Sequence, residues 1–220
     1  MSSPPSNSVN TPVFDAAFRE QFETLLAWRR DVRRFRSEPV PESLLEEVLA
    51  TARFAPSVGN SQPWRFVLVE STEARAAVRE SFERCNAEAL QDYSGSRASL
   101  YARLKLSGLD DAPVHLAVFC DGGTEAGHGL GRKTMPETLK YSVVTAIYTI
   151  WLAARARGLG MGWVSILEPD AVAQCLQVPQ EWELVAYLCI GYPEEDHTDP
   201  ELERHGWQSQ DPEAAKLRRR

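Results

Sequence analysis

A long apolar segment between Pro136 and Gly158 constrains the fold of this chain more than any other feature. Proline is favoured in the first turn of a helix and glycine just after its end, so these two residues mark the boundaries of one long helix. From Val143 to Ala154 the segment is apolar nearly all round, which is typical of a helix buried on every side. Because a chain of 220 residues forms only a small domain, we expect a second subunit to complete the burial of this helix.

Hydrophobic periodicity predicts further helices and short strands on both sides of this segment. The run VHLAVFCD, residues 114–121, is almost continuously apolar, as expected of a strand that is covered on both faces. We expect helices over residues 14–28, 41–55, 73–90 and 96–106 and a short one from Glu168, and strands over residues 66–70, 158–167 and 183–192.

Composition indicates one domain with short extensions. With 43% hydrophobic residues the chain can bury a sizeable core, and its length fits a single domain. Residues 1–12 are rich in Ser, Pro and Asn, so we expect an arm that is disordered or orders only against a partner subunit. The domain is expected over residues 13–207, and residues 208–220 form a tail.

Charge and cysteine usage exclude several classes of protein. A formal charge of -7 argues against a nucleic-acid or membrane-surface protein, because polyanion binding requires a broad basic surface. No apolar stretch reaches the ~18 residues of a membrane span, and the N-terminus lacks the features of a signal peptide, so we expect a cytoplasmic protein. The four cysteines are widely spaced, without a C-x-x-C pair or a zinc-like His partner, so we expect reduced cysteines and no metal site.

One dense cluster of arginines stands out against this acidic background. The segment RRDVRRFR, residues 29–36, contains five arginines around Asp31. Guanidinium groups bind phosphate through paired, charge-assisted hydrogen bonds, so the cluster is a candidate anion site. The alternative is a solvated basic face at the end of a helix. Asp31 opposes anion binding unless it does chemistry beside the anion or holds the arginines in place.

A second polar segment, APSVGNSQPWRF at residues 55–66, follows the expected second helix. Its hydroxyl, amide and open backbone groups can bind a flat polar heterocycle, and its Pro-Trp pair supplies an apolar wall. The alternative is an ordinary connection between a helix and a strand, since proline, glycine and asparagine are common turn residues.

Together the two segments resemble the FMN-dependent nitroreductase family, which has an Arg-Arg-Ser-type motif followed by a Pro-Ser-x-x-Asn-x-Gln-Pro-Trp loop. The residues that match the loop are Pro56, Ser57, Asn60, Gln62, Pro63 and Trp64. The resemblance covers about residues 20–207. It implies an α+β fold with a central, mostly antiparallel sheet flanked by helices, and an intertwined homodimer in which the segment from Pro193 reaches across the partner.

Two residues resemble in particular the branch of that family that makes 5,6-dimethylbenzimidazole, the lower ligand of vitamin B12. They are Asp31, where the reductases usually carry Ser, and Ser165 within GLGMGWVSIL. The resemblance implies that reduced FMN is a substrate, that O2 is consumed and that erythrose 4-phosphate is the second product. It also implies no metal, and a separate NAD(P)H-dependent flavin reductase that supplies the reduced FMN.

The resemblance also implies which residues contact the flavin. The predicted FMN-binding residues are Arg29, Arg30, Asp31, Val32, Arg33, Ser57, Asn60, Gln62, Leu104, Ser107, Val164, Ser165, Ile166 and Leu167. Arg34 and Arg36 are left to solvent or salt bridges. Asn60 and Gln62 could instead form hydrogen bonds within their own loop.

Asp31 and Ser165 are the predicted catalytic residues. Cleavage of the bond between C1′ and C2′ of the ribityl chain needs a positioned base, and Asp31 is the carboxylate that the motif offers. Ser165 is assigned to the oxygen step near flavin N5. For Asp31 the alternative is a salt bridge that orders Arg29 or Arg33.

Two other functions remain open from the residues alone. The first is an NAD(P)H-dependent nitroreductase or flavin reductase that retains its FMN. Asp31 argues against it, because a carboxylate near the ribityl chain adds nothing to hydride transfer, and the segment Gly-His-Gly-Leu-Gly lacks the G-x-G-x-x-G spacing. The second is a flavin-binding module without turnover, which would form no product from reduced FMN in air.

Overall fold

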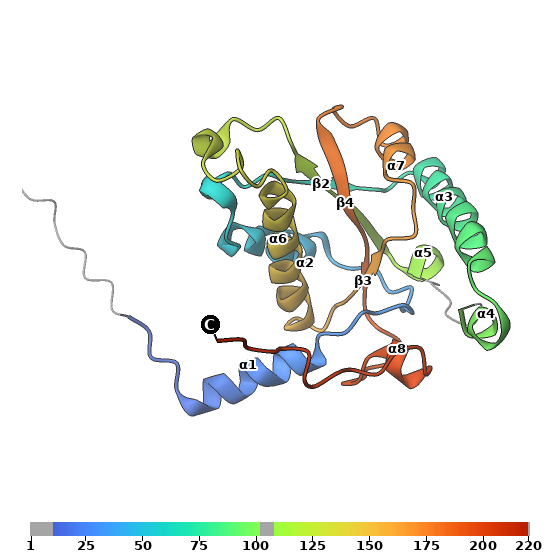
Figure 1. The fold of residues 1–220 in the computed structure, drawn as a ribbon, viewed down its shortest axis with the longest axis horizontal. Coiled ribbons are helices and arrows are strands. Elements are labelled where there is room, and N and C mark those ends of the chain that lie inside the picture. The colour runs from blue at the N-terminus through green and yellow to red at the C-terminus, as the bar shows by residue number, and fades with distance from the viewer. Residues whose placement is uncertain (1–10, 102–107, 220) are drawn as a thin grey trace, which may run out of the picture.

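The fold is α+β, as predicted, with one four-stranded sheet between helices (Figure 1). The computed structural model describes residues 11–101 and 108–219. The strands run in the spatial order β1-β2-β4-β3, and all three pairings are antiparallel. Their bounds are Trp64–Leu68 for β1, Val114–Asp121 for β2, Gly160–Val164 for β3 and Trp182–Gly191 for β4.

The longer helices form where the sequence periodicity predicts them, whereas the short helices Gly108–Asp111 and Glu201–Arg204 were not predicted. The α-helices are α1 (Ala16–Trp28), α2 (Glu42–Ala50), α3 (Thr72–Gln91), α4 (Gly95–Tyr101), α5 (Gly108–Asp111), α6 (Thr138–Arg155), α7 (Pro169–Cys175) and α8 (Glu201–Arg204). Short 3-10 helices lie at Thr51–Phe54 (η1), Val58–Asn60 (η2) and Ala126–Gly129 (η3). Asp15 and Ser71 start α1 and α3 by accepting a hydrogen bond from a backbone N–H of the first turn, the usual role of an N-cap side chain. The end of the helix expected over residues 96–106 lies outside the described residues.

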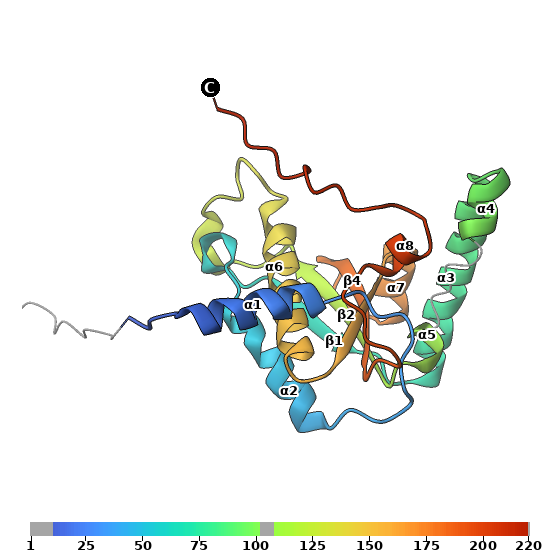
Figure 2. The same ribbon diagram turned by 90° about the horizontal axis from the view of Figure 1, so that it is seen from below.

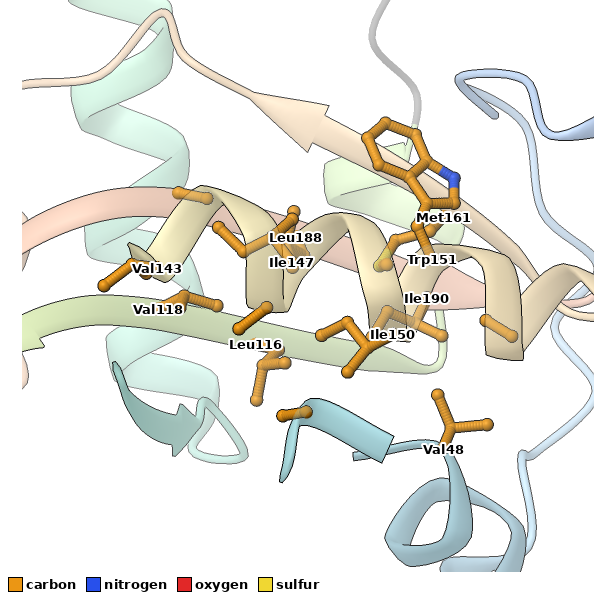
Figure 3. Close-up of a cluster of buried hydrophobic side chains, with 14 of the residues drawn as sticks. Val48, Leu116, Val118, Val143, Ile147, Ile150, Trp151, Met161, Leu188 and Ile190 are labelled. Carbon is orange, nitrogen blue, oxygen red and sulfur yellow. The ribbon is translucent and has the colours of Figure 1, made fainter. Parts of the chain in front are cut away.

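Strand β2 separates two hydrophobic clusters because successive side chains of a strand point to opposite faces. Leu116 and Val118 belong to the cluster that packs on α6 and α2, whereas Ala117 and Phe119 belong to the one near α3 and α7. The first cluster brings one side of α6 onto the sheet (Figure 3), through Val143, Ile147, Ile150, Trp151, Leu116, Val118, Leu188 and Ile190. Each fully buried aliphatic side chain of this kind contributes roughly 1.5–3 kcal/mol to folding.

The opposite side of α6 is exposed to solvent, so a single chain does not bury this helix on every side. Tyr141, Val144 and Tyr148 follow one another at helical spacing and are 41–55% exposed. Helix α1 projects from the body of the molecule (Figures 1 and 2) and contains no buried residue. A second subunit that covers these surfaces remains a prediction, and residues 1–10 of the expected N-terminal arm lie outside the described part of the chain.

The segment after β4 packs on its own chain. The backbone N–H groups of Arg36 and Glu194 donate to the carbonyls of Tyr192 and Arg34, at 2.8 and 3.2 Å. Farther along, Trp207 packs edge-on against Tyr93 at the end of α3, with the ring centroids 5.5 Å apart. Residues 193–207 thus pack on their own chain, and the expectation that the segment from Pro193 also reaches across a partner stays a prediction. In the described part of the chain, no helix has both the length and the apolar character needed to cross a bilayer.

A buried histidine gives the fold a defined response to acid. His115 on β2 is 2% exposed, and its Nδ1 lies 2.9 Å from the hydroxyl of Tyr187. Burial, reinforced by the positive charge of Arg75, lowers the pKa of His115 to about 4 from 6.5. The folded state therefore binds fewer protons at this residue than the unfolded state, so stability decreases as the pH falls from about 6.5 to about 4.

We expect the contribution of His115 to the free energy of unfolding to be roughly 2 kcal/mol smaller at pH 5 than at pH 7. Urea unfolding of the wild type and of His115→Gln at both pH values measures this difference, because the variant lacks the titrating group. His128→Gln, which changes an exposed histidine, is the control and should keep the wild-type pH dependence. An equal pH dependence in wild type and His115→Gln would contradict the assignment.

Candidate functional site

The site is built where the Asp31–Val32 segment runs beside the edge strand β3. The Val32 N–H donates to the carbonyl of Met161 at 3.0 Å, and Asp31 and Met161 form a parallel bridge. The Asp31 side chain continues this pairing, because its Oδ1 accepts the backbone N–H of Trp163 at 2.9 Å. The predicted catalytic carboxylate is therefore held by the backbone of the sheet.

Two glycines of β3 make this close approach possible. A Cβ atom on Gly162 would lie 2.2 Å from the Val32 carbonyl oxygen, and one on Gly160 would lie 2.8 Å from Val32 Cγ2. Real Cβ atoms do not come that close to other atoms, so a side chain at either position would displace Val32 and with it Asp31. The glycines of the GMGWV sequence thus have a packing role that the sequence alone did not reveal.

The arginines of the first motif have different surroundings. Arg29 stacks over the rings of Tyr148 and Trp151 on α6, at 5.8 and 5.0 Å from their centroids. Its Nε is buried and has no hydrogen-bond partner among the described residues. Arg30 instead donates from Nε to the carbonyl of Thr198 at 2.7 Å.

The other arginines of the motif pair with carboxylates. Arg33 Nε lies 3.3 Å from Asp31 Oδ2 and 4.0 Å from Glu201 Oε2. Arg34 pairs with Glu195 and Glu201, and Arg36 pairs with Glu38. The prediction that Arg34 and Arg36 form salt bridges is confirmed, and so is the alternative in which Asp31 forms a salt bridge with Arg33.

A pocket opens between this motif, the end of α6 and the segment from Glu195 to Arg204. Its lining includes the predicted residues Arg30, Asp31, Val32 and Arg33, and also Arg34, Arg155, Arg204, Glu195, Asp196, Asp199 and Glu201. Five arginines therefore face five carboxylates. The expected dense cationic site is in this structure an approximately balanced network of charges, because the acidic residues that neutralise it come from a segment more than 160 positions away in sequence.

Asp31 is the carboxylate of this network whose pKa is raised. Burial raises the pKa of Asp31 above its usual value of 3.8, the N–H of Trp163 and the charge of Arg33 act against that shift, and the charge of Glu201 adds to it. In the single chain, 37% of the Asp31 side chain remains exposed to the pocket. A partly accessible carboxylate of raised pKa is a better proton acceptor than an ordinary surface aspartate.

A small cavity of about 10 Å³ lies behind Asp31, next to Val164 and Cys189. This is about the volume that holds a single water molecule, so it cannot hold an aromatic ring system. Burial raises the pKa of the Cys189 thiol to about 12, which excludes Cys189 as a thiolate nucleophile at neutral pH.

The second motif forms a loop that docks on the first half of α6. The Ser57 hydroxyl accepts the N–H of Gln62 at 3.1 Å, and the Ser142 hydroxyl accepts the N–H of Val58 at 3.0 Å. Asn60 and Gln62 have φ values of 55° and 47°, with exposed side chains. Neither side chain forms a hydrogen bond within the described residues, so the alternative that they hold the loop together finds no support.

The two motifs do not meet in one chain. The loop contacts α6 at Ser142 and Thr145, whereas the arginine segment contacts it at Tyr148, Trp151 and Arg155. At 1.5 Å per residue, the two sets of contacts extend along roughly 20 Å of the helix axis from Ser142 to Arg155, and the nearest of them, Thr145 and Tyr148, are one helical turn apart. Ser57, Asn60 and Gln62 are absent from the lining of the pocket around Asp31.

The remaining predicted residues lie at the end of β3. Ser165 directly follows the strand and is exposed, and Ile166 is half-buried. The side chains of Val164 and Leu167 are buried in the cluster near α3 and α7, so only their backbone groups are available to a ligand. Leu104 and Ser107 lie outside the described residues. Two pocket residues that the sequence did not single out, Arg155 and Arg204, are isolated in sequence from the arginine cluster.

Comparison with known proteins identifies close relatives. The nitroreductase family model matches residues 26–192. A 5,6-dimethylbenzimidazole synthase of Rhodospirillum rubrum is 58% identical over 201 residues, which cover 91% of this chain and 95% of that protein. A 5,6-dimethylbenzimidazole synthase of Rhodobacter capsulatus is 48% identical over 195 residues, covering 89% and 94% of the two chains.

A solved structure shows the same fold with a flavin bound. The crystal structure of oxidised iodotyrosine deiodinase in complex with FMN and 3-iodo-L-tyrosine superposes with a TM-score of 0.67 at 27% sequence identity. The superposition covers 80% of this chain and 91% of the deiodinase chain. The fold found here is therefore the fold of a flavoprotein.

We expect Gly162→Ala to destabilise the protein by roughly 1–3 kcal/mol, the usual cost of overpacking a tight site. The added methyl group must push Val32 away from β3, because it would lie 2.2 Å from the Val32 carbonyl oxygen. Chemical denaturation measures the loss. Gly122→Ala is the matched control, since the nearest atom to its new methyl group is 3.3 Å away and a small shift relieves that contact. Equal stability of the two variants would contradict the packing role of Gly162.

Proposed function

Because the chain belongs to the nitroreductase family, we propose that it is a 5,6-dimethylbenzimidazole synthase. In this proposal it is an oxidoreductase that converts reduced FMN and O2 to 5,6-dimethylbenzimidazole and erythrose 4-phosphate. The observation that carries the proposal is the 58% identity to a protein of that name, over 91% of this chain and 95% of the relative. The reaction serves vitamin B12 biosynthesis, in which 5,6-dimethylbenzimidazole is the lower ligand.

The residues present fit FMN. Arg29 has a buried Nε without a partner among the described residues, next to the exposed row of α6. A buried N–H of a charged group is costly unless a ligand or water satisfies it. Ser61, next to the loop residues Asn60 and Gln62, likewise has a buried hydroxyl without a partner in the described part of the chain. Arg29, Arg30 and Arg33 would hold the phosphate and ribityl chain.

Reduced FMN, when bound, supplies the electrons for O2 and the carbon atoms of the product. The task of the protein is to hold the ribityl chain beside a base. Asp31 is fixed by the N–H of Trp163 and faces the arginines of the same motif. In the proposal Asp31 accepts the proton that is released as the C1′–C2′ bond breaks, and Ser165 directs the oxygen step from the end of β3.

The proposed active site is shared between two subunits. A homodimer is what the resemblance to the nitroreductase family implies. Within one chain the loop with Ser57 and the pocket with Asp31 are far apart, and the row formed by Tyr141, Val144 and Tyr148 is exposed between them. A second copy packed on this row would cover the open side of α6 and bring the loop of one chain to the arginines of the other. The proposed partners are thus a second copy and a separate flavin reductase.

A reconstituted reaction tests the proposed function. The purified protein is incubated in air with FMN and NADH, with and without a separate flavin reductase, and mass spectrometry detects 5,6-dimethylbenzimidazole. Product should form only when the reductase is present, because the flavin has to arrive reduced. Absence of product under both conditions would reject the proposal, and rapid flavin reduction by NADH alone would indicate a nitroreductase or flavin reductase instead.

We expect Asp31→Asn to bind reduced FMN but to form little 5,6-dimethylbenzimidazole. The amide keeps the shape of the side chain and can still accept the N–H of Trp163, but it cannot act as a base. Asp196→Asn is the control, because Asp196 also lines the pocket and pairs with Arg155. Single-turnover reactions measure the product yield. A wild-type yield from Asp31→Asn would leave Asp31 with only its salt bridge to Arg33.

We expect Arg29→Gln to weaken FMN binding about tenfold or more, since a charge-assisted hydrogen bond contributes roughly 1.5–3 kcal/mol. Arg36→Gln is the control, because Arg36 already pairs with Glu38 at 3.5 Å, whereas the buried Nε of Arg29 has no partner in the described chain. Fluorescence titrations with FMN and with riboflavin, which lacks the phosphate, distinguish a contact with the phosphate from a contact with the rest of the flavin. If Arg29 binds the phosphate, the riboflavin affinity should be nearly unchanged. An equal loss for both ligands would place Arg29 elsewhere.

A further inference from the structure

Glu201 is a buried carboxylate at the centre of the charge network. Only 9% of its side chain is exposed, less than for any other carboxylate that pairs with Arg33 or Arg34 in the described chain. Its Oε2 lies 4.0 Å from Arg33 Nε, and its Oε1 lies 3.6 Å from Arg34 NH1 and 3.5 Å from His205 Nε2. Buried charges persist where they have partners, so this group is fixed by the basic residues around it.

Glu201 and Asp31 approach the same atom. Asp31 Oδ2 lies 3.3 Å from Arg33 Nε, the nitrogen that Glu201 also approaches. The Arg33 side chain is 12% exposed, so its charge is little screened by water. One guanidinium group is thus shared by two carboxylates. Because Arg33 also attracts Glu201, it neutralises the charge of Asp31 less completely than it would alone.

The segment that carries Glu201 is held on both sides. Before it, the carbonyl of Thr198 accepts the hydrogen bond from Arg30 Nε. After it, the N–H of Trp207 donates to Leu202 at 2.8 Å, and the Trp207 ring packs against Tyr93. The contacts of residues 198–207 therefore fix the backbone at Glu201, and this backbone places the Glu201 side chain between Arg33 and Arg34.

We propose that Glu201 is a positioning residue for Asp31, holding Arg33 between the two carboxylates so that Asp31 remains able to accept a proton. This inference rests on the proposed function and assigns to the C-terminal segment a part in its chemistry. Glu201 itself does not need to touch the substrate. Its effect reaches Asp31 through Arg33 and through its own negative charge.

The electrostatics of Asp31 agree with this arrangement. Burial is the largest cause of its raised pKa, and the charge of Glu201 raises the pKa further, while the Trp163 N–H and Arg33 lower it. The Cys189 thiol also faces Asp31, and Arg34 and His205 face Glu201 from the far side. Removal of the Glu201 charge takes away a like charge and frees Arg33 to pair fully with Asp31. Both effects lower the pKa of Asp31.

The first test compares Glu201→Gln with Glu195→Gln in the full-length protein without flavin. Both glutamates pair with Arg34, but Glu195 is 60% exposed, whereas Glu201 is 9% exposed and also lies 4.0 Å from Arg33 Nε. Carbon NMR of labelled aspartate, with the Asp31 signal assigned by its loss in Asp31→Asn, gives the titration of this carboxyl group. The midpoint should move to lower pH in Glu201→Gln and stay at the wild-type value in Glu195→Gln. An unmoved midpoint in folded Glu201→Gln would overturn the inference.

The second test measures the pH dependence of 5,6-dimethylbenzimidazole formation. In Glu201→Gln the acidic limb of the rate profile should move to lower pH and the plateau should fall, because a base of lower pKa is a weaker proton acceptor. Glu201→Asp keeps the charge and should restore most of the wild-type profile, which a purely structural role does not require. A profile that keeps its wild-type midpoint while only its height changes would contradict the inference.

The two tests separate this inference from the proposed function. The NMR titration needs neither flavin nor turnover, so it remains decisive if the wild type forms no 5,6-dimethylbenzimidazole. In that case the proposed function fails while the control of Asp31 by Glu201 can still be established. Circular dichroism and thermal unfolding confirm that each variant is folded before either test. If Glu201→Gln does not fold, Glu201→Asp should still titrate at Asp31 like the wild type, and a lowered midpoint there would overturn the inference.

Discussion

The contact between the Asp31–Val32 backbone and strand β3 is the constraint on which the rest of the site depends. Gly160 and Gly162 leave room for Val32, and the N–H groups of Val32 and Trp163 then fix the segment along the strand. This pairing decides where Asp31 points and from where the arginines around it emerge. The backbone of the edge strand β3 therefore determines the position of the Asp31 carboxylate in the pocket.

The pocket is a balanced ionic network, and this changes how its arginines are understood. Arg33 and Arg34 are already paired with carboxylates, whereas Arg29 rests on two aromatic rings with a buried Nε that has no partner in the described chain. Arg29 does not line this pocket in the single chain, and a phosphate that binds to it would not displace an acid. Arg33 lies against both Asp31 and Glu201, and we propose that it influences Asp31 in addition to contacting the flavin. The same network explains why an acidic C-terminal segment packs on an arginine-rich motif, because the opposite charges of the two segments attract each other.

Hydrophobic periodicity predicted the main helices and strands, and the family resemblance predicted their assembly around an antiparallel sheet. The apolar pattern from Val143 to Ala154 identified α6, and the run at residues 114–121 identified the buried strand β2, because these patterns depend on local geometry alone. The sequence analysis offered an Asp31–Arg33 salt bridge as an alternative, because the two residues are only two positions apart. It also predicted that Arg34 forms salt bridges, because exposed arginines commonly do so. Glu201, Arg155 and the packing role of Gly162 were not predicted, because each acts through a contact between segments far apart in sequence. Only the folded chain brings such residues together.

The central claim is that β3 holds Asp31 beside the ribityl chain of a flavin whose site is completed by a second copy of the chain. A crystal structure of the full-length protein with oxidised FMN tests it most directly. The account predicts the Asp31 carboxylate within hydrogen-bonding distance, roughly 2.6–3.2 Å, of a ribityl hydroxyl. It also predicts the phosphate on Arg29, and the partner subunit's Ser57 at the flavin. A flavin bound elsewhere, or an Asp31 that contacts only Arg33 and Trp163, would contradict it.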